Sequence, residues 1–137
     1  MLDSTDKRIL EELAKNGRMS MKKLGEQVHL SGQAAANRVA KLEEDHIIES
    51  YTIRQNYQKT GLAVHLFITI LTRSFDHQPF FSFLDTQRPY ILHRFKTSGE
   101  GCYLLECRFP SNEELDKFLA SLTRYVNYRL SMVISEV

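Results

Sequence analysis

The chain is poor in cysteine and has no long apolar run, and these two absences exclude several classes of protein. Only two of its 137 residues are cysteine, which is too few for the disulfide framework of a small secreted domain. Cys102 and Cys107 lie an odd number of positions apart in one predicted strand, so they face opposite ways and cannot bridge each other. No stretch approaches the roughly 18 apolar residues that cross a bilayer, and the start of the chain turns polar at once. We therefore expect a cytoplasmic protein with no membrane partner.

The residue patterns of common enzyme sites are also missing. The five histidines, at positions 29, 46, 65, 77 and 93, show no H-x-x-x-H spacing, and the cysteines do not form a pair suited to zinc. There is no glycine-rich phosphate loop and no nucleophile elbow. We expect no enzymatic activity, no cofactor and no metal.

Charge is nearly balanced overall, at +1, but it is unevenly distributed. Between Arg18 and Lys41, five cations stand against one carboxylate, Glu26. Since phosphate attraction acts locally, this basic segment suits a DNA contact surface. The alternative is a solvated surface with ordinary lysines.

The first 55 residues predict three short helices followed by a strand. Helical periodicity covers 3–16 and 21–28, and a third helix begins after Ser31, a good N-cap, and continues to about residue 45. Its buried stripe is Ala35, Val39 and Leu42. Residues 47–54 are rich in β-branched and aromatic residues and predict a strand or short hairpin. This order is typical of a winged helix-turn-helix.

The periodicity changes after a polar segment, 56–61, which we predict to be a hinge between domains 1–55 and 62–137. Strands are predicted over 62–73, 90–97, 102–109 and 128–137. Helices are predicted over 78–88 and after the Ser111–Glu114 capping box. The resulting βαββαβ order is the ferredoxin-like pattern, so the fold class is α+β.

The face of the third helix opposite its apolar stripe predicts how DNA is recognised. Gln33 and Asn37 can form paired hydrogen bonds with adenine, and Ala34 can lie against a thymine methyl group. Arg38 and Lys41 lie farther along the helix, where phosphates are the expected partners. The predicted DNA-binding residues are Lys22, Lys23, Ser31, Gln33, Ala34, Asn37, Arg38 and Lys41. The alternative is an ordinary exposed polar surface, with Ser31 acting as a helix cap only.

The predicted first strand is apolar on both faces, as is the last. Two helices can cover only one face of a four-stranded sheet, so we expect a second copy of the chain to cover the other. A dimer would also place two recognition helices about 34–36 Å apart, the spacing that reads a pseudo-palindromic site.

The N-terminal pattern resembles the signature of the Lrp/AsnC (feast/famine) transcription regulators. It includes Leu2-Asp3, Ile9-Leu10, Asn16-Gly17-Arg18-Met19-Ser20, Val28-His29-Leu30-Ser31 and Arg38-Val39. The resemblance implies a DNA-binding regulator whose second domain dimerises and senses an amino acid or small metabolite, with dimers assembling further, for example into octamers. Two alternatives stay open: an architectural DNA-compacting protein with weak sequence preference, and an enzyme like the haem-pathway decarboxylases, which are similar in fold.

One turn departs from the family pattern. Members that respond to amino acids commonly carry a G-D-x-D-Y-like segment, and the equivalent here is Gly99, Glu100, Gly101, Cys102 and Tyr103. Gly101 and Cys102 replace a bulky residue and a carboxylate that would pair with a ligand ammonium group. These five residues are our candidate effector contacts, and the alternative is a tight turn that needs glycine at positive φ.

Overall fold

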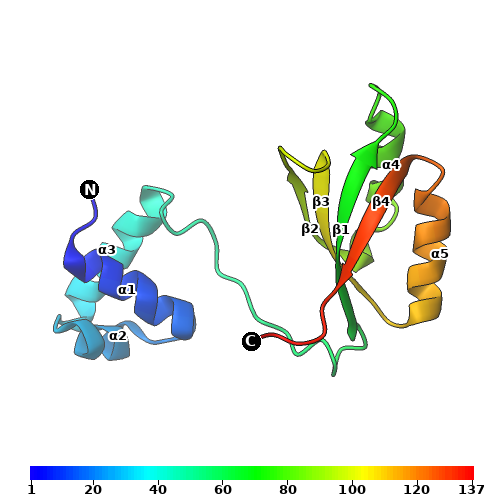
Figure 1. Cartoon of the computed structure of the whole chain (residues 1–137). Helices are drawn as coiled ribbons and strands as arrows, with labels where there is room; N and C mark the ends of the chain where they lie inside the picture. Colours follow the sequence, from blue (N-terminus) through cyan, green and yellow to red (C-terminus); the bar gives the residue numbers. More distant parts are fainter. The chain divides into compact units, whose positions relative to one another are not determined.

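The computed structural model describes all 137 residues, which divide into two compact units, Met1–Arg54 and Gln55–Val137 (Figure 1). Both cysteines are free, and none of the helices has the length and apolar composition needed to cross a membrane. The boundary between the units falls beside a stretch without regular secondary structure, residues 49–56. The segment 56–61 lies in the second unit, and most of it forms a turn.

The first unit is a bundle of three helices, as predicted. Its helices are α1 (Ser4–Lys15), α2 (Met21–Val28) and α3 (Gly32–Glu44). Each begins at a side chain that accepts a hydrogen bond from a backbone N–H of the first turn, and these caps are Asp3, Ser20 and Ser31. The core joins all three helices through Ile9, Leu24, Val28, Ala35, Val39 and Leu42.

The turn between α2 and α3 is packed tightly on α2. His29 ends α2 in the left-handed conformation, at φ 60°. A Cβ on Gly25 would lie 2.5 Å from the backbone oxygen of Leu30, closer than any side chain tolerates. Glycine at this position therefore lets the turn backbone approach α2, and this approach sets the direction in which α3 leaves the turn.

The predicted strand or hairpin over residues 47–54 does not form. Tyr51 and Ile53 are 52% and 78% exposed, and no strand of the chain pairs with this segment. β-Branched and aromatic residues favour a strand where a neighbouring strand supplies hydrogen bonds and a surface to pack on, and both are missing here. The prediction of a wing was therefore wrong, and the unit is a three-helix helix-turn-helix.

The second unit has the predicted βαββαβ order. Its elements are β1 (Val64–Thr72), α4 (Gln78–Asp85), the short 3₁₀ helix η1 (Arg88–Tyr90), β2 (Ile91–Lys96), β3 (Tyr103–Phe109), α5 (Asn112–Leu122) and β4 (Val126–Met132). The strands form one antiparallel sheet in the order β2-β3-β1-β4. The last strand begins and ends earlier than predicted, and Ile134 lies beyond it, 98% exposed.

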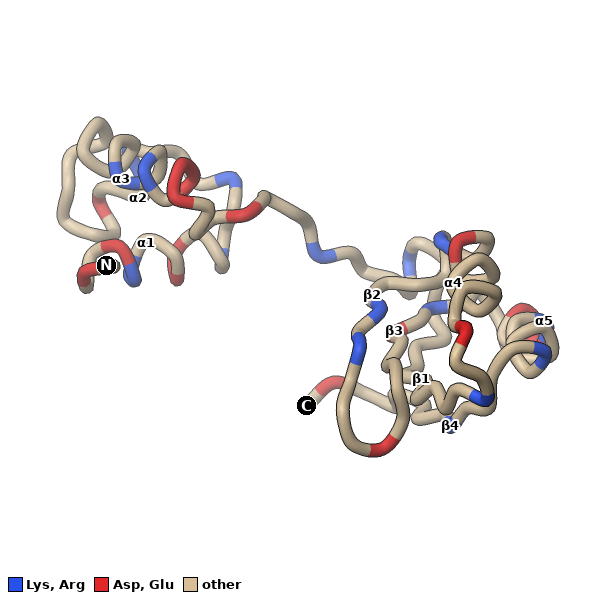
Figure 2. The backbone as a smooth tube through the Cα atoms, turned by 90° about the horizontal axis from the view of Figure 1, so that it is seen from above, with Lys and Arg blue, Asp and Glu red and all other residues tan.

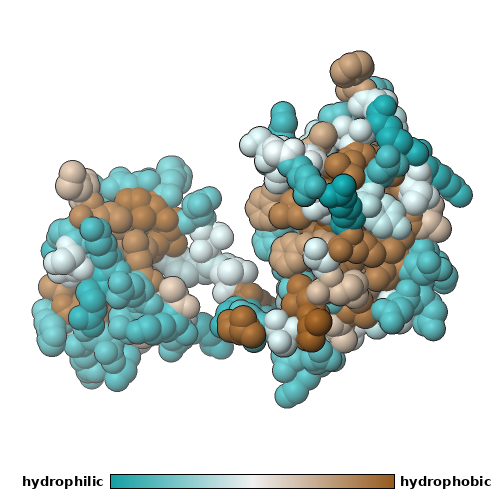
Figure 3. All heavy atoms as spheres, viewed as in Figure 1, coloured by the Kyte–Doolittle hydropathy of each residue, from teal (hydrophilic) through white to brown (hydrophobic).

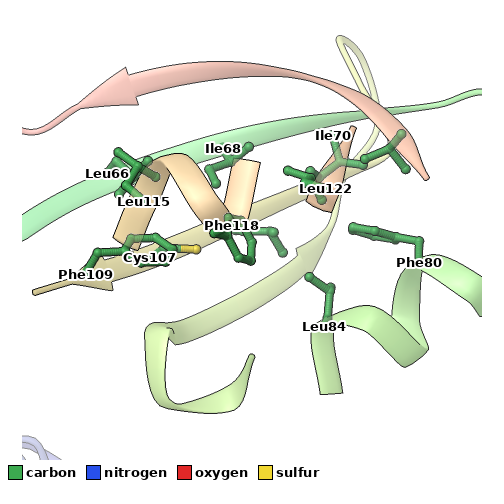
Figure 4. Packing of buried hydrophobic residues seen from close by; sticks show 12 residues of the cluster. Leu66, Ile68, Ile70, Phe80, Leu84, Cys107, Phe109, Leu115, Phe118 and Leu122 are labelled. Atoms are coloured by element: carbon green, nitrogen blue, oxygen red, sulfur yellow. The ribbon is translucent and has the colours of Figure 1, made fainter. Parts of the chain in front are cut away.

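One face of the sheet packs against α4 and α5 and forms the core (Figure 4). Leu66, Ile68 and Ile70 of β1 are completely buried and meet Phe118 and Leu122 of α5. Burying each such side chain stabilises the fold by about 1.5–3 kcal/mol. This alternation along β1 confirms the predicted inward-facing positions.

The opposite face, here called the outer face, is not covered by either helix. Its cross-strand pairs include His65 with Arg108, Phe67 with Glu106, and Thr69 with Leu104. The outer face comprises His65, Phe67, Thr69, Leu71, His93, Phe95, Leu104, Glu106 and Arg108, together with Asn127, Arg129 and Ser131 of β4. Apolar atoms gather over the strands of this unit in Figure 3. The prediction of apolar residues on both faces is confirmed for β1. It is wrong for the last strand, because every outer-face residue of β4 is polar.

Candidate functional site

The face of α3 that points away from the core is polar, as the spacing predicted. Gln33, Asn37 and Lys41 are exposed, whereas Ala35 and Val39 are buried. The Gln33 side-chain amide donates a hydrogen bond to the Asn37 Oδ1 at 3.0 Å. The two amides thus lie side by side, one helical turn apart. Both could give up this mutual hydrogen bond and form hydrogen bonds with the edges of bases instead.

Helices α2 and α3 also carry exposed lysines, and Figure 2 colours the Lys and Arg positions of the backbone blue. Lys22 and Lys23 are exposed on α2. Lys23 lies 4.0 Å from Glu26, and Lys41 lies 3.6 Å from Asp45, both as exposed pairs within one helix. Pairs of this kind contribute little and are easily exchanged, so all three ammonium groups are available to phosphates.

Ser31 and Ala34 lie together at the start of α3. The Ser31 hydroxyl oxygen accepts the Ala34 backbone N–H at 3.1 Å, which confirms the predicted cap. Ala34 is half-buried. Their contacts with DNA stay a prediction.

Arg38 has partners within the chain. Its guanidinium Nη1 donates to Asp3 at 2.5 Å and to Asp6 at 3.2 Å, so it ties α3 to the first turn of α1. We had placed Arg38 among the phosphate contacts because it lies next to the polar face along the helix. Arg38 therefore links α3 to α1, and its contact with a phosphate stays a prediction.

The same three residues form a small acid-sensitive unit. The Asp6 backbone N–H, followed by the Arg38 guanidinium, lowers the pKa of Asp3 below its ordinary value of 3.8. The Asp3 and Asp6 carboxylates raise the pKa of Arg38 in turn. A carboxyl group with a lowered pKa stabilises the fold above its unfolded-state pKa, and this contribution is lost as the pH falls through the folded-state value.

The turn between β2 and β3 contains the candidate effector contacts. Gly99 and Gly101 have positive φ angles of 108° and 92°. A Cβ on Gly101 would lie 2.6 Å from the Thr69 methyl carbon and 2.9 Å from the Ile70 backbone oxygen. Both glycines therefore have a conformational reason to be present, which bears out the tight-turn interpretation without excluding a ligand.

The other side chains of this turn have partners within the chain. The Glu100 carboxylate accepts from Arg129 at 2.6 Å, and the Tyr103 hydroxyl lies 2.7 Å from His77 Nδ1. Cys102 Sγ lies 3.1 Å from the Thr72 hydroxyl, whose hydrogen bond lowers the pKa of this thiol. The turn is thus fastened to β4, to the end of β1 and to the start of α4.

A pocket of about 280 Å³ opens between the end of β1, the start of α4 and the start of β4. Arg73, Arg124 and Asp76 line it, so it presents charge of both signs. His77 and Thr72 also line it, and these are the residues that contact Tyr103 and Cys102. The pocket and the turn therefore share a wall, although only Tyr103 of the five turn residues lines any pocket that we find, a separate one of about 200 Å³.

Several of these features escaped the sequence analysis. The Asp3–Asp6 capping box is visible as an Asp-x-x-Asp before an apolar run and could have been identified. The partners of Arg38 are 35 and 32 positions away, and the two pocket arginines belong to different strand ends. No spacing within one element brings such residues together, so only the fold does.

Comparison with known proteins assigns both units. The AsnC-type helix-turn-helix domain matches residues 2–43, and the Lrp/AsnC ligand binding domain matches residues 65–137. The chain belongs to the Lrp/AsnC family. The predicted family, the fold class and the function of this Lrp/AsnC protein as a DNA-binding transcriptional regulator are thereby confirmed.

Named relatives that match nearly the whole chain support this family assignment. The HTH-type transcriptional regulator LrpA of Bacillus subtilis is 49% identical, covering 99% of this chain and 100% of that protein. LrpB of the same organism is 37% identical, covering 99% and 91%. The structure of B. subtilis LrpC, 31% identical, superposes with a TM-score of 0.92 over 100% of this chain and 97% of that chain. A transcriptional regulator from Neisseria meningitidis, solved as a complex with L-Met, is 28% identical, with a TM-score of 0.90 over 100% and 92%.

The contact of Arg38 with α1 yields a prediction on stability. Arg38→Met should lower the melting temperature of the helix-turn-helix unit near neutral pH, because two carboxylates lose their partner. The difference from wild type should shrink as the pH falls below 4, where Asp3 takes up a proton. Circular dichroism of thermal unfolding over a pH series measures this. Lys7→Met, on the exposed surface of α1, is the matched control. An Arg38→Met effect that does not vary with pH would contradict the assignment.

Proposed function

We propose that this regulator binds pseudo-palindromic DNA as a dimer or higher assembly, with α3 of each copy in the major groove. The supporting observation is that one face of α3 is anchored by Ala35, Val39 and Leu42 while the opposite face carries paired amides. In a helix-turn-helix this face is the one that meets base edges. The proposal includes a site of action in the cytoplasm.

Within this proposal the residues have separate roles. Gln33 and Asn37 read base edges, and Ala34 contacts a thymine methyl group. The three exposed lysines of α2 and α3 bind phosphates and contribute affinity that does not depend on sequence. Ser31 holds the start of α3 in place and can also face the DNA backbone.

We propose that a second copy of the chain covers the outer face. Phe67 and Phe95 lie there, and Phe95 is 49% exposed. Exposed aromatic rings gathered on one face of a sheet are typical of a surface that a partner covers. Dimerisation joins two individually weak DNA contacts into one usable affinity. Dimers can then assemble further, for example into octamers.

We propose that an amino acid or a small metabolite modulates the regulator through the second unit. Two features support this: the N. meningitidis relative was solved with L-Met, and the charged pocket shares a wall with the turn of Gly99–Tyr103. Arg73 or Arg124 is suited to a ligand carboxylate, and Asp76 to an ammonium group. Ligand contact with His77 would reach the turn through Tyr103.

Two alternatives remain distinguishable by experiment. An architectural DNA-compacting protein would bind scrambled and specific DNA equally well. An enzyme similar to the haem-pathway decarboxylases would bind a tetrapyrrole. We propose that the protein is not an enzyme, in keeping with relatives that are named as transcriptional regulators.

The recognition helix is tested by exchanging its side chains. Gln33→Ala and Asn37→Ala should each reduce the preference for operator over scrambled DNA by about 10- to 100-fold, because each removes a paired hydrogen bond with a base. Lys41→Ala should weaken binding to both DNAs equally and reduce the salt slope by about 1. Quantitative gel shifts on selected genomic fragments measure both effects. Lys117→Ala, an exposed lysine of α5, is the control. Equal losses on both DNAs for the two amide variants would refute the assignment.

The outer face is tested through Phe67. Phe67→Glu should convert the protein to a monomer at micromolar concentration, because it places a carboxylate opposite Glu106 in an apolar interface. Sedimentation velocity measures the mass. Phe75→Glu exchanges another phenylalanine, fully exposed and outside the sheet, and should leave the assembly intact. A wild-type monomer, or a Phe67→Glu dimer, would contradict the proposal.

The pocket is tested by separating DNA binding from its response to ligand. Protein amino acids are added one at a time to gel shifts, beginning with L-Met. Arg124→Ala should abolish the response and leave DNA binding without ligand unchanged, whereas Arg88→Ala, which removes an exposed arginine outside the pocket, should retain it. If Arg124→Ala responds normally and Glu100→Ala does not, the turn rather than the pocket holds the ligand.

A further inference from the structure

A network of four charged or titratable side chains crosses three strands of the outer face. The Glu106 carboxylate of β3 lies between two imidazoles, with Oε2 at 2.6 Å from His65 Nε2 and Oε1 at 2.9 Å from His93 Nδ1. Arg108 Nη2 lies 3.2 Å from the other ring nitrogen of His65, Nδ1. Nothing in the function derived so far uses these residues.

The hydrogen bonds fix the protonation state of His65. A carboxylate only accepts and a guanidinium only donates, so His65 must donate from Nε2 and accept at Nδ1. This is the neutral imidazole. Burial raises the pKa of Glu106, but the hydrogen bonds from His93 and His65 lower it by more, so this carboxyl group stays ionised. With His65 neutral, the charges of Glu106 and Arg108 balance each other.

A proton on His65 Nδ1 would disrupt this arrangement. It would place two N–H groups and two positive charges against each other at 3.2 Å. Arg108 has little to replace the lost bond, because its Nε is already buried without a partner and its Nη1 donates to the Leu62 backbone oxygen. Its guanidinium also lies 4.2 Å from the centre of the Tyr57 ring, which leaves little room to move away.

Aromatic rings flank the network, and the other charged side chain of this face, Arg129 of β4, faces Thr69 and is already paired with Glu100. Phe67 lies beside His65 and Phe95 stacks on His93. On the flank toward β4, Val133 donates its backbone N–H to His65, and the next residue of β4 on this face is Ser131. His65 and Glu106 are each only 19% exposed in the single chain, and a second copy on this face would enclose them further.

We propose that the His65–Glu106–His93 network makes self-association through the outer face sensitive to pH, with the assembly separating in weak acid. This rests on the proposed dimer. The contacts of His65 lie within one chain and favour the neutral imidazole in both forms. In the separated form water reaches the network and can solvate an added proton, whereas a second copy would exclude that water and make the charge costly to bury. Because the separated form binds more protons, acid favours separation. Loss of the dimer in acid removes high-affinity DNA binding as well.

The expected size of the effect follows from ordinary imidazole chemistry. Each imidazole takes up at most one proton, so each network can weaken association by at most about tenfold per pH unit. A dimer contains two such networks, so the dissociation constant should rise roughly 100-fold between pH 7.5 and pH 5.5.

Sedimentation equilibrium of the full chain at pH 7.5, 6.5 and 5.5 tests the proposal. Wild type should show the rise in dissociation constant while circular dichroism shows it still folded. The double variant His65→Gln/His93→Gln keeps neutral donors and acceptors and should associate independently of pH. The control His29→Asn/His46→Asn also removes two histidines, at left-handed positions that asparagine tolerates, and should keep the wild-type response.

Equal dissociation constants for wild type at pH 7.5 and 5.5 would overturn the proposal, whatever the variants do. A double Gln variant that still separates in acid would overturn it too. If the double variant does not fold, the two single variants, His65→Gln and His93→Gln, are measured separately and decide the point. A wild type that is monomeric even at pH 7.5 would instead refute the proposed dimer itself.

Discussion

The position of the recognition helix depends on a contact that leaves no room for a side chain. The backbone of the turn after α2 lies on Gly25, and any Cβ there would collide with the Leu30 carbonyl group. This contact, together with the burial of Ala35, leaves α3 only one orientation on the bundle. The amides of Gln33 and Asn37 therefore point outward without any strain of their own. The recognition that we propose for this face of α3 therefore depends on backbone packing on the far side of the helix.

In the second unit the constraint is different. Its sheet has two faces, and its two helices cover only one of them. The face toward α4 and α5 is filled by aliphatic and aromatic side chains and by Cys107, whose pKa is raised to about 12 by burial. The outer face mixes aromatic rings with the His65–Glu106–His93 network. Such a mixture suits the surface that we propose, which is exposed to water in the single chain and covered by a second copy in the dimer. A purely apolar face would favour permanent association, and a purely charged one would prevent it.

Local chemistry made much of this fold predictable from the sequence. Ser20, Ser31 and Ser111 each precede a helix and accept a backbone N–H of its first turn, and the alternation along β1 was visible as a period of two. The strand predicted over residues 47–54 does not form, because residues with a strand preference form a strand only beside a second strand. The contacts of Arg38 with Asp3 and Asp6 were not predictable, because these partners lie on another helix, more than 30 positions away. The contacts around Glu106 likewise depend on strand register, which no local pattern encodes.

The connection between the units has a consequence for the choice of binding site. Residues 49–56 lack regular secondary structure, and eight extended residues reach at most about 27 Å. A tether of that length is comparable to one turn of B-DNA, so a helix-turn-helix unit could follow its half-site around the double helix while the sheets stay joined. Operators of this regulator could therefore differ in the distance between their halves, and the length of the tether would limit how widely that distance varies.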